Sequence, residues 1–304
     1  MNADELDYYA GQSAVTDPGR ASAQLTGIPT DIAGLHRAAH GLVIHYRAED
    51  PVGRHGFPEA RMAEIDSRHA ETMLERLAQL ADQPPTEPRE PQERLVGCCR
   101  DFTVLFLAMA RSLAMPARAR VGFASYFVRD FKLDHELAEV WDSAEDRWRL
   151  LDANIGQGHR DPNDGAAIDP LDVPRDRFLV AGAAWQRCRR EEDDPATFVV
   201  SPQLELPNTR GWPYLRHNLL QDLAALNKTE MLLWDEWGVA GQPDVDDDDL
   251  ALLDRLADLT AAADPPLGEL RDLFQQEPLR VPPVVTSWNP LTGEPRTVAV
   301  DGQV

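Results

Sequence analysis

The segment that most constrains the fold is an almost uninterrupted apolar run at residues 103–113. It is preceded by Cys98 and Cys99 and followed by Pro116. A helix on the surface of a globular protein has a polar face, so a run without one predicts a helix buried over most of its circumference. We expect this helix to stop near Met115, because the residue before a proline is disfavoured in the helical region. Cys99 therefore stands at the beginning of a buried helix.

Three segments that follow have the composition of strands. Residues 117–127 carry Val, Phe and Tyr, and residues 135–141 and 147–152 are two shorter strands joined by a polar turn. One helix followed by an antiparallel meander predicts an α+β fold, in which the cysteine-bearing helix packs on an antiparallel sheet. Further helical patterns occur at both ends of the chain.

The alternation of side chains along the two shorter strands predicts which residues share a face. If the turn pairs Trp141 with Trp148, the strands run antiparallel and Asp152 lies opposite Leu137. His135 is then the diagonal neighbour of Asp152 on the same face, at a separation that long side chains can bridge.

A cysteine at the head of a helix, a histidine and an aspartate together favour thiol acyl transfer. A cysteine attacks as the thiolate, which is a small fraction of a free thiol at neutral pH. The helix N-terminus favours negative charge at Cys99, and His135 is the candidate base. Asp152 can accept the other ring N–H of His135 and hold its tautomer. Backbone N–H groups near Cys99 are the expected donors to an oxyanion.

Residues 94–155 resemble the core of the transglutaminase-like superfamily, a branch of papain-like thiol enzymes, in its bacterial type. The motifs that carry the resemblance are Gly97-x-Cys99-x-Asp101-Phe102, Ala114-Met115-Pro116-Ala117-Arg118, Val121-Gly122-Phe123, His135-x-x-x-Glu139-Val140 and Trp148-x-x-x-Asp152. The resemblance implies a papain-like core with Cys99, His135 and Asp152 as the catalytic triad. The family often carries an aromatic residue where Leu137 stands here, a departure that affects the active-site wall. Its members include protein crosslinkers, proteases, peptide N-glycanases, amide-forming biosynthetic enzymes and some inactive proteins.

Four residues near the triad in sequence are predicted to bind substrate. Cys98 fits the family pattern less well than its neighbour as a nucleophile, so we expect it to pack or to line the pocket. Arg100 either supports the thiolate by charge or points to solvent. Leu137 and Trp141 share the strand face of the predicted base. Asp101 is interpreted as a carboxylate in the first turn of the helix.

Composition excludes several other classes of function. The formal net charge of −22 argues against a nucleic-acid partner and permits an amine-bearing substrate. No apolar run approaches the roughly 18 residues that a membrane span needs, and the acidic N-terminus is unlike a secretory signal. The three cysteines are expected to be reduced, so we predict a cytoplasmic protein. His36 and His40 lie one helical turn apart, as zinc ligands can, but no accompanying glutamate or cysteine pair supports a metal site. We expect neither a metal nor a cofactor.

The predicted organisation has three parts: a flexible arm at residues 1–30, a catalytic core at 31–205, and a mainly helical extension at 206–304 with an extended tail. The predicted function is acyl transfer through a thioacyl-enzyme on a small-molecule or peptide substrate, with biosynthesis as one setting. An acyl donor is the first substrate, and water or an amine resolves the intermediate by amide hydrolysis, transamidation or amide formation. Two alternatives are an inactive transglutaminase-like scaffold and a zinc hydrolase that uses the N-terminal histidines. The sequence sets no oligomeric state.

Overall fold

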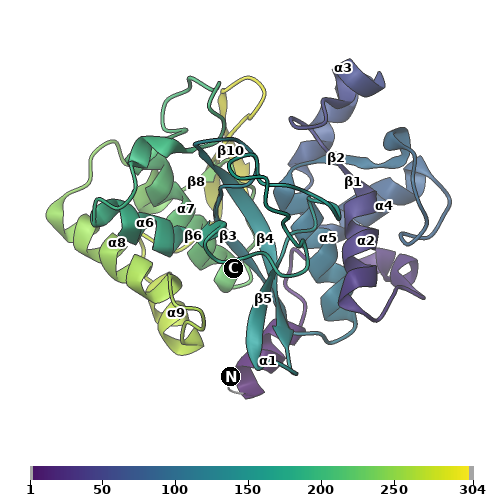
Figure 1. Cartoon of the computed structure of the whole chain (residues 1–304), viewed down its shortest axis with the longest axis horizontal. Helices are drawn as coiled ribbons and strands as arrows, with labels where there is room; N and C mark the ends of the chain where they lie inside the picture. Colours follow the sequence, from purple (N-terminus) through teal and green to yellow (C-terminus); the bar gives the residue numbers. More distant parts are fainter. Residues whose placement is uncertain (1–2, 301–304) are drawn as a thin grey trace. The chain divides into compact units, whose positions relative to one another are not determined.

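The computed structural model describes residues 3–300, and Figure 1 shows their helices and strands. The chain divides into two compact units that alternate along the sequence. The first comprises the chain up to Ala119 together with Leu137–His159 and Asp169–Val173, and the second comprises Arg120–Glu136, Arg160–Ile168 and the chain from Pro174 onward. Strands β3 (Ala117–Ala124) and β4 (Lys132–Asp142) each contribute residues to both units.

The first unit is organised around the predicted buried helix, α5, which begins at Cys99 and ends at Ser112. All of its residues from Cys99 to Arg111 are buried, as the missing polar face predicts. It packs against three other helices, α1 (Ala3–Ala10), α2 (Ile32–Leu42) and α4 (Ala70–Leu80) (Figure 1). Other elements of this unit are α3 (Pro51–His55), the 3-10 helices η1 (Gly19–Leu25), η2 (Glu59–Asp66) and η3 (Pro91–Glu93), and the parallel strands β1 (Val43–His45) and β2 (Leu95–Gly97).

The predicted antiparallel pair is present with the predicted register. Strand β4 pairs with β5 (Arg147–Leu151), and Trp141 lies opposite Trp148. The larger sheet has the order β5-β4-β3-β6, and β7 also pairs with β4. This mixture of helices with an antiparallel sheet confirms the predicted α+β class.

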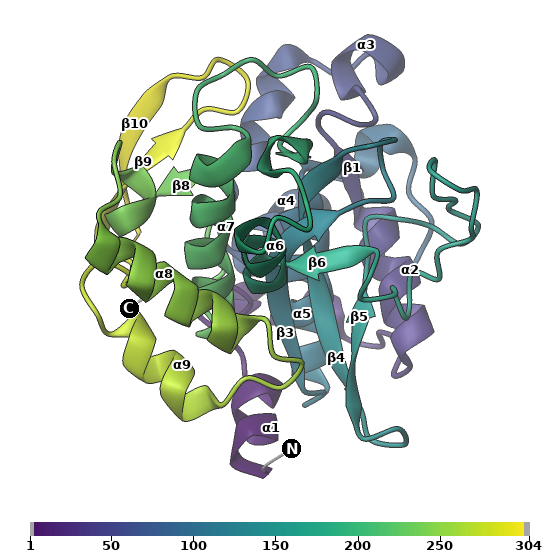
Figure 2. The same cartoon turned by 60° about the vertical axis from the view of Figure 1, so that its left-hand side comes forward.

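The second unit is mainly helical, as Figure 2 shows from another side. Its helices are α6 (Ala181–Arg189), α7 (Gly211–Leu226), α8 (Asp247–Thr260), α9 (Leu267–Phe274), and the short 3-10 helices η4 (Pro195–Thr197) and η5 (Gly238–Gly241). Its strands are β6 (Phe178–Val180), β7 (Phe198–Val199), β8 (Asp235–Glu236), β9 (Val284–Trp288) and β10 (Pro295–Ala299), and β8, β9 and β10 form a small antiparallel sheet. The predicted extended tail is thus a β-hairpin up to Ala299, and residues 301–304 lie outside the described part.

Several segments differ from the expectation from sequence. Within residues 3–30, where we expect a flexible arm, α1 and η1 form and Tyr9 is buried, because its ring packs edge-on against Trp148 at 5.7 Å between centroids. Residues 59–81 carry apolar residues roughly at helical spacing, which predicts one helix, but they form the separate helices η2 and α4. Residues 178–190, which we expect to form one helix, begin as strand β6 and continue as helix α6. Among residues 3–300, no helix is long and apolar enough to cross a membrane.

Candidate active site

Cys99 is the first residue of α5, and Cys98 is the N-cap residue before it. The first backbone N–H groups of a helix have no partner within the helix, and the helix dipole is positive at this end. The carboxylate of Asp101 satisfies one N–H group at this end of the helix, because its Oδ2 accepts a hydrogen bond from the backbone N–H of Cys98 at 2.8 Å. The helix head therefore holds two adjacent thiols at the position where the helix best stabilises negative charge.

Gly97 allows the Asp101 carboxylate to reach the chain before the helix. A Cβ atom at this position would lie 2.7 Å from Asp101 Oδ2 and 2.9 Å from Val43 Cγ1, closer than ordinary contacts allow. The spacing Gly-x-Cys-x-Asp thus has a steric reason: the glycine makes room for the carboxylate that caps the cysteine-bearing helix.

Arg100 is fully buried and binds backbone carbonyls instead of pointing to solvent. Its Nη2 donates to Arg68 O at 2.6 Å, and its Nη1 donates to Ser67 O at 3.3 Å and to Asp101 Oδ1 at 3.2 Å. The guanidinium thereby ties the head of α5 to the segment before α4. Of the two roles expected for Arg100, the solvent-facing one does not occur.

Burial and neighbouring groups shift the pKa values of Cys98, Asp101 and Cys188. A hydrogen bond with the Cys99 side chain raises the pKa of the Cys98 thiol well above its ordinary value, and burial and the nearby Asp101 carboxylate raise it further. Cys98 is therefore held as the neutral thiol. Burial also raises the pKa of Asp101 to about 6, although Arg100 and the Cys98 N–H favour its charged form. Cys188, in the second unit, has a pKa raised to about 12 by burial and is unreactive as a nucleophile at neutral pH.

Asp152 stands directly after the last paired residue of β5, and its backbone N–H donates to Pro170 O at 2.8 Å. Two histidines of α2 hold the loop that follows. His36 Nε2 lies 3.1 Å from Asp152 O and 3.0 Å from Ile155 O, and His40 Nδ1 lies 3.1 Å from Ala153 O. Because carbonyl oxygens only accept hydrogen bonds, His36 carries its proton on Nε2 and His40 carries one on Nδ1.

These two histidines are functional candidates whose role the sequence did not reveal. Their spacing predicts a shared helix face, and their rings are stacked with centroids 5.9 Å apart. Nothing in the sequence identifies the carbonyls that they bind. Among residues 3–300, no group of three or more His, Cys, Asp or Glu side chains is arranged to hold a metal ion.

His135 is a residue of β4 within the second unit, and it is buried. Three aromatic rings of that unit surround its imidazole, with centroids 4.9 Å away for Phe127, 6.2 Å for Phe178 and 6.3 Å for Tyr126. These rings restrict the orientation of the imidazole. The role of His135 in the site rests on strand alternation and on the family resemblance.

Of the predicted substrate-binding residues on β4, Leu137 is fully buried two positions after His135. Trp141 is half-buried, and its ring packs edge-on against Trp148 at 5.5 Å. Trp141 lies six positions along β4 from His135, which corresponds to about 20 Å. The structure therefore does not bring Trp141 and His135 together.

The family resemblance is confirmed by comparison with known proteins. Residues 60–153 match the family model of the transglutaminase-like superfamily. The match contains Cys99, His135 and Asp152, and it identifies this part of the chain as a transglutaminase-like core. It supports, in general terms, a cysteine-dependent enzyme.

A solved structure of a protein from Cytophaga hutchinsonii, provisionally described as a cysteine protease, is 16% identical with a TM-score of 0.35, and the similarity covers 59% of this chain and 46% of that chain. The chain thus spans about half the length of that protein, and similarity at this level carries no conclusion on activity. A search of the curated proteins finds no match.

Proposed function

We propose that the protein is a cysteine-dependent acyl-transfer enzyme in which Cys99 is the nucleophile, His135 the general acid and base, and Asp152 the residue that orients His135. The observation that carries this proposal is the chemistry of the α5 N-terminus. Cys99 is the first residue of a 14-residue buried helix, and the neighbouring Cys98 has a raised pKa through its hydrogen bond with the Cys99 side chain. A neutral thiol that donates to a neighbour stabilises a thiolate there, which adds to the effect of the helix dipole.

The register of β4 and β5 supports the pairing of the other two residues. Ala138 lies opposite Leu151, so one further step along the two strands sets Asp152 opposite Leu137. Strand alternation then predicts His135 as the diagonal neighbour of Asp152 on the same face, and long side chains can interact between such diagonal positions. The carbonyls held by His36 and His40 fix the backbone from which Asp152 projects.

The proposed reaction has two half-reactions. The Cys99 thiolate attacks the carbonyl carbon of an amide, ester or thioester, and the tetrahedral oxyanion is stabilised by backbone N–H groups at the start of α5. The C–N, C–O or C–S bond to the leaving group breaks, the leaving group takes a proton from the His135 imidazolium, and a thioester remains on Cys99. Water or an amine then gives a proton to His135 and attacks the thioester, which releases the acyl product and the thiolate.

The substrates follow from this chemistry as an acyl donor, of small-molecule or peptide type, and water or an amine as the acceptor. The acidic protein attracts a cationic amine at long range, which favours amide formation or transamidation. We place the enzyme in the cytoplasm because its three cysteines are free thiols.

The test is the rate at which iodoacetamide alkylates Cys99 as a function of pH, with the labelled residue identified by mass spectrometry. We expect labelling at Cys99 well below the ordinary thiol pKa of about 8.5, and we expect His135→Ala to shift it toward that value. Cys98→Ala, the matched control, retains the labelling, whereas Cys99→Ala loses it. Labelling that follows an ordinary thiol pKa would instead point to an inactive scaffold.

A further inference from the structure

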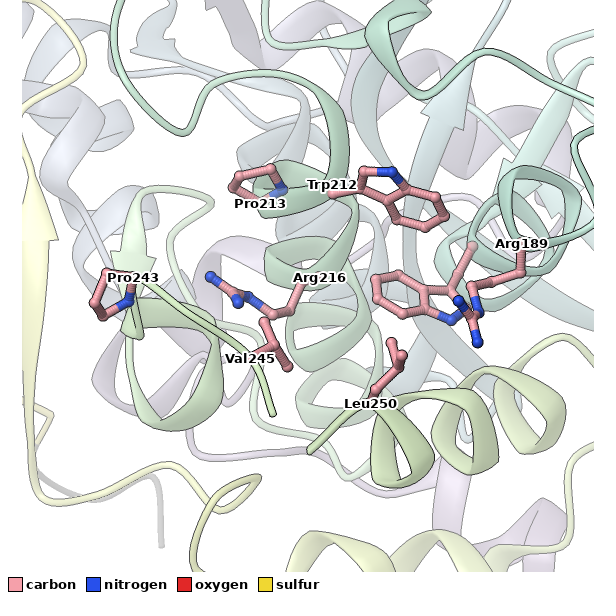
Figure 3. A pocket seen from close by; sticks show the side chains of 8 residues that line it. Arg189, Trp212, Pro213, Arg216, Pro243, Val245 and Leu250 are labelled. Atoms are coloured by element: carbon pink, nitrogen blue, oxygen red, sulfur yellow. The ribbon is translucent and has the colours of Figure 1, made fainter. Parts of the chain in front are cut away.

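The second unit contains a pocket of about 290 Å³ that the proposed reaction does not use. Figure 3 shows its lining side chains, which come from α6, the first half of α7, the segment before α8 and the start of α8. None of them belongs to α5, β4 or β5, the elements that carry or immediately precede Cys99, His135 and Asp152.

Two tryptophans form an aromatic wall of this pocket. The rings of Trp185 and Trp212 meet edge-on with centroids 5.1 Å apart. The orientation of Trp185 is fixed because its Nε1 donates to Asp254 at 2.7 Å. Val245 and Leu250 add aliphatic surface to the lining (Figure 3). Trp212 and Val245 remain 40% and 38% exposed, so the apolar wall is open to solvent.

Arg216 adds a buried positive charge to this apolar lining. Arg216 is 4% exposed, and its Nη2 donates to Ala240 O at 3.2 Å and to Gln242 O at 2.6 Å. Its Nε is buried and has no hydrogen-bond partner. No carboxylate among residues 3–300 forms an ion pair with this guanidinium, and Glu236 and Asp249 influence its charge only from a distance.

Two other buried arginines have carboxylate partners, whereas Arg89, which does not line this pocket, resembles Arg216 in donating to backbone carbonyls. Arg118 pairs with Glu139 at 2.7 Å, and Arg120 pairs with Asp222 through Nε at 3.0 Å and Nη2 at 2.9 Å. A buried charge without a partner is costly, and a guanidinium stays protonated at all ordinary pH values. Burial lowers the pKa of Arg216, as expected for a cation in an apolar site. An anion delivered by a ligand would supply the missing partner.

We propose that this pocket binds a small organic carboxylate with a flat apolar body. The carboxylate pairs with the Arg216 guanidinium, and the body packs against Trp185, Trp212 and Leu250. One unpaired guanidinium matches one negative charge, because the second arginine of the lining, Arg189, is already paired with Asp254 at 2.9 Å. The volume suits a single ring with a short side chain, since pockets for drug-sized ligands begin at about 300 Å³.

The test uses 3-phenylpropionate as the probe and 3-phenylpropionamide as its uncharged counterpart, with binding to the full chain measured by calorimetry. Charge-assisted hydrogen bonds predict that the acid binds about tenfold or more tighter than the amide. Equal affinity of the two compounds, or no saturable binding of the acid at millimolar concentrations, would overturn the proposal.

Variants at an exposed lining residue locate the binding without disturbing the core. Val245→Asp places a negative charge in the lining and is expected to weaken binding of the acid, whereas Val245→Lys is expected to preserve or strengthen it. Leu291→Asp is the matched control, because Leu291 is a 50% exposed apolar residue outside the pocket. Arg216→Gln is expected to remove the preference for the acid over the amide. An equal effect of Val245→Asp and Leu291→Asp would refute the assignment. Because only binding is measured, failure here is distinguishable from failure of the Cys99 chemistry.

Discussion

Replacement of His36 by alanine should loosen the loop that carries Asp152. In the structure, one buried Nε2–H is shared between the carbonyls of Asp152 and Ile155. The substitution removes this donor from both carbonyls. His36→Gln is the matched control, because its side-chain amide N–H can occupy the place of Nε2.

The expected loss of stability follows from the number of hydrogen-bonding groups that lose a partner. One net hydrogen bond contributes about 0.5–1.5 kcal/mol, and each buried polar group left without a partner costs about 1–3 kcal/mol. With partial relaxation of the loop, we expect His36→Ala to lower the free energy of unfolding by about 2–4 kcal/mol. His40→Ala, which removes one bond to Ala153 O from a half-buried ring, should cost about 1 kcal/mol.

The pH dependence gives a second readout. Burial lowers the pKa of His36 below its ordinary value of 6.5, although the Asp152 carbonyl partly opposes this shift. The unfolded chain therefore takes up a proton that the folded protein does not. The stability that His36 contributes is fully present above pH 6.5 and is lost as the pH falls through and below that value. The advantage of wild type over His36→Gln should shrink accordingly.

Urea denaturation at several pH values measures both effects, and alkylation of Cys99 reports on the site. If the loop positions Asp152 and Asp152 orients His135, His36→Ala should move the pH profile of alkylation toward that of an ordinary thiol, and His36→Gln should restore it. Equal stability of wild type and His36→Ala would refute the reasoning about the loop. Reduced stability with unchanged alkylation would refute only its link to the triad.

Two further substitutions test the packing around the site. Arg118→Met removes the arginine that pairs with the fully buried Glu139 and should destabilise the protein by about 3–5 kcal/mol. Adding Glu139→Leu should recover most of this loss, as measured by thermal or chemical denaturation. A double variant as unstable as the single one would contradict this. Gly97→Ala should destabilise the protein by about 1–3 kcal/mol because the new methyl group meets Asp101 and Val43. Gly41→Ala is the control, because the space around Gly41 is open. Equal changes in stability for the two variants would contradict the steric role of Gly97.

Local patterns in the sequence were sufficient for the elements that carry the chemistry. The apolar run before Pro116 predicts α5, and the polar turn at residues 142–146 predicts the pairing of Trp141 with Trp148. Each depends on interactions between residues close in the chain, where helical period, strand alternation and the geometry of proline act directly. The sequence motifs likewise identified the transglutaminase-like core.

The sequence by itself therefore determined the α+β class, the helix that begins at Cys99, and the register in which Trp141 lies opposite Trp148. Only the tertiary structure determined which groups the buried arginines and histidines contact. It buried Arg100 against backbone carbonyls, directed His36 and His40 to the loop after β5, and left Arg216 without a carboxylate in an aromatic pocket. These outcomes join residues from about 24 to more than 100 positions apart, and no local periodicity specifies which of many equivalent carbonyls or carboxylates a buried cation or imidazole will meet.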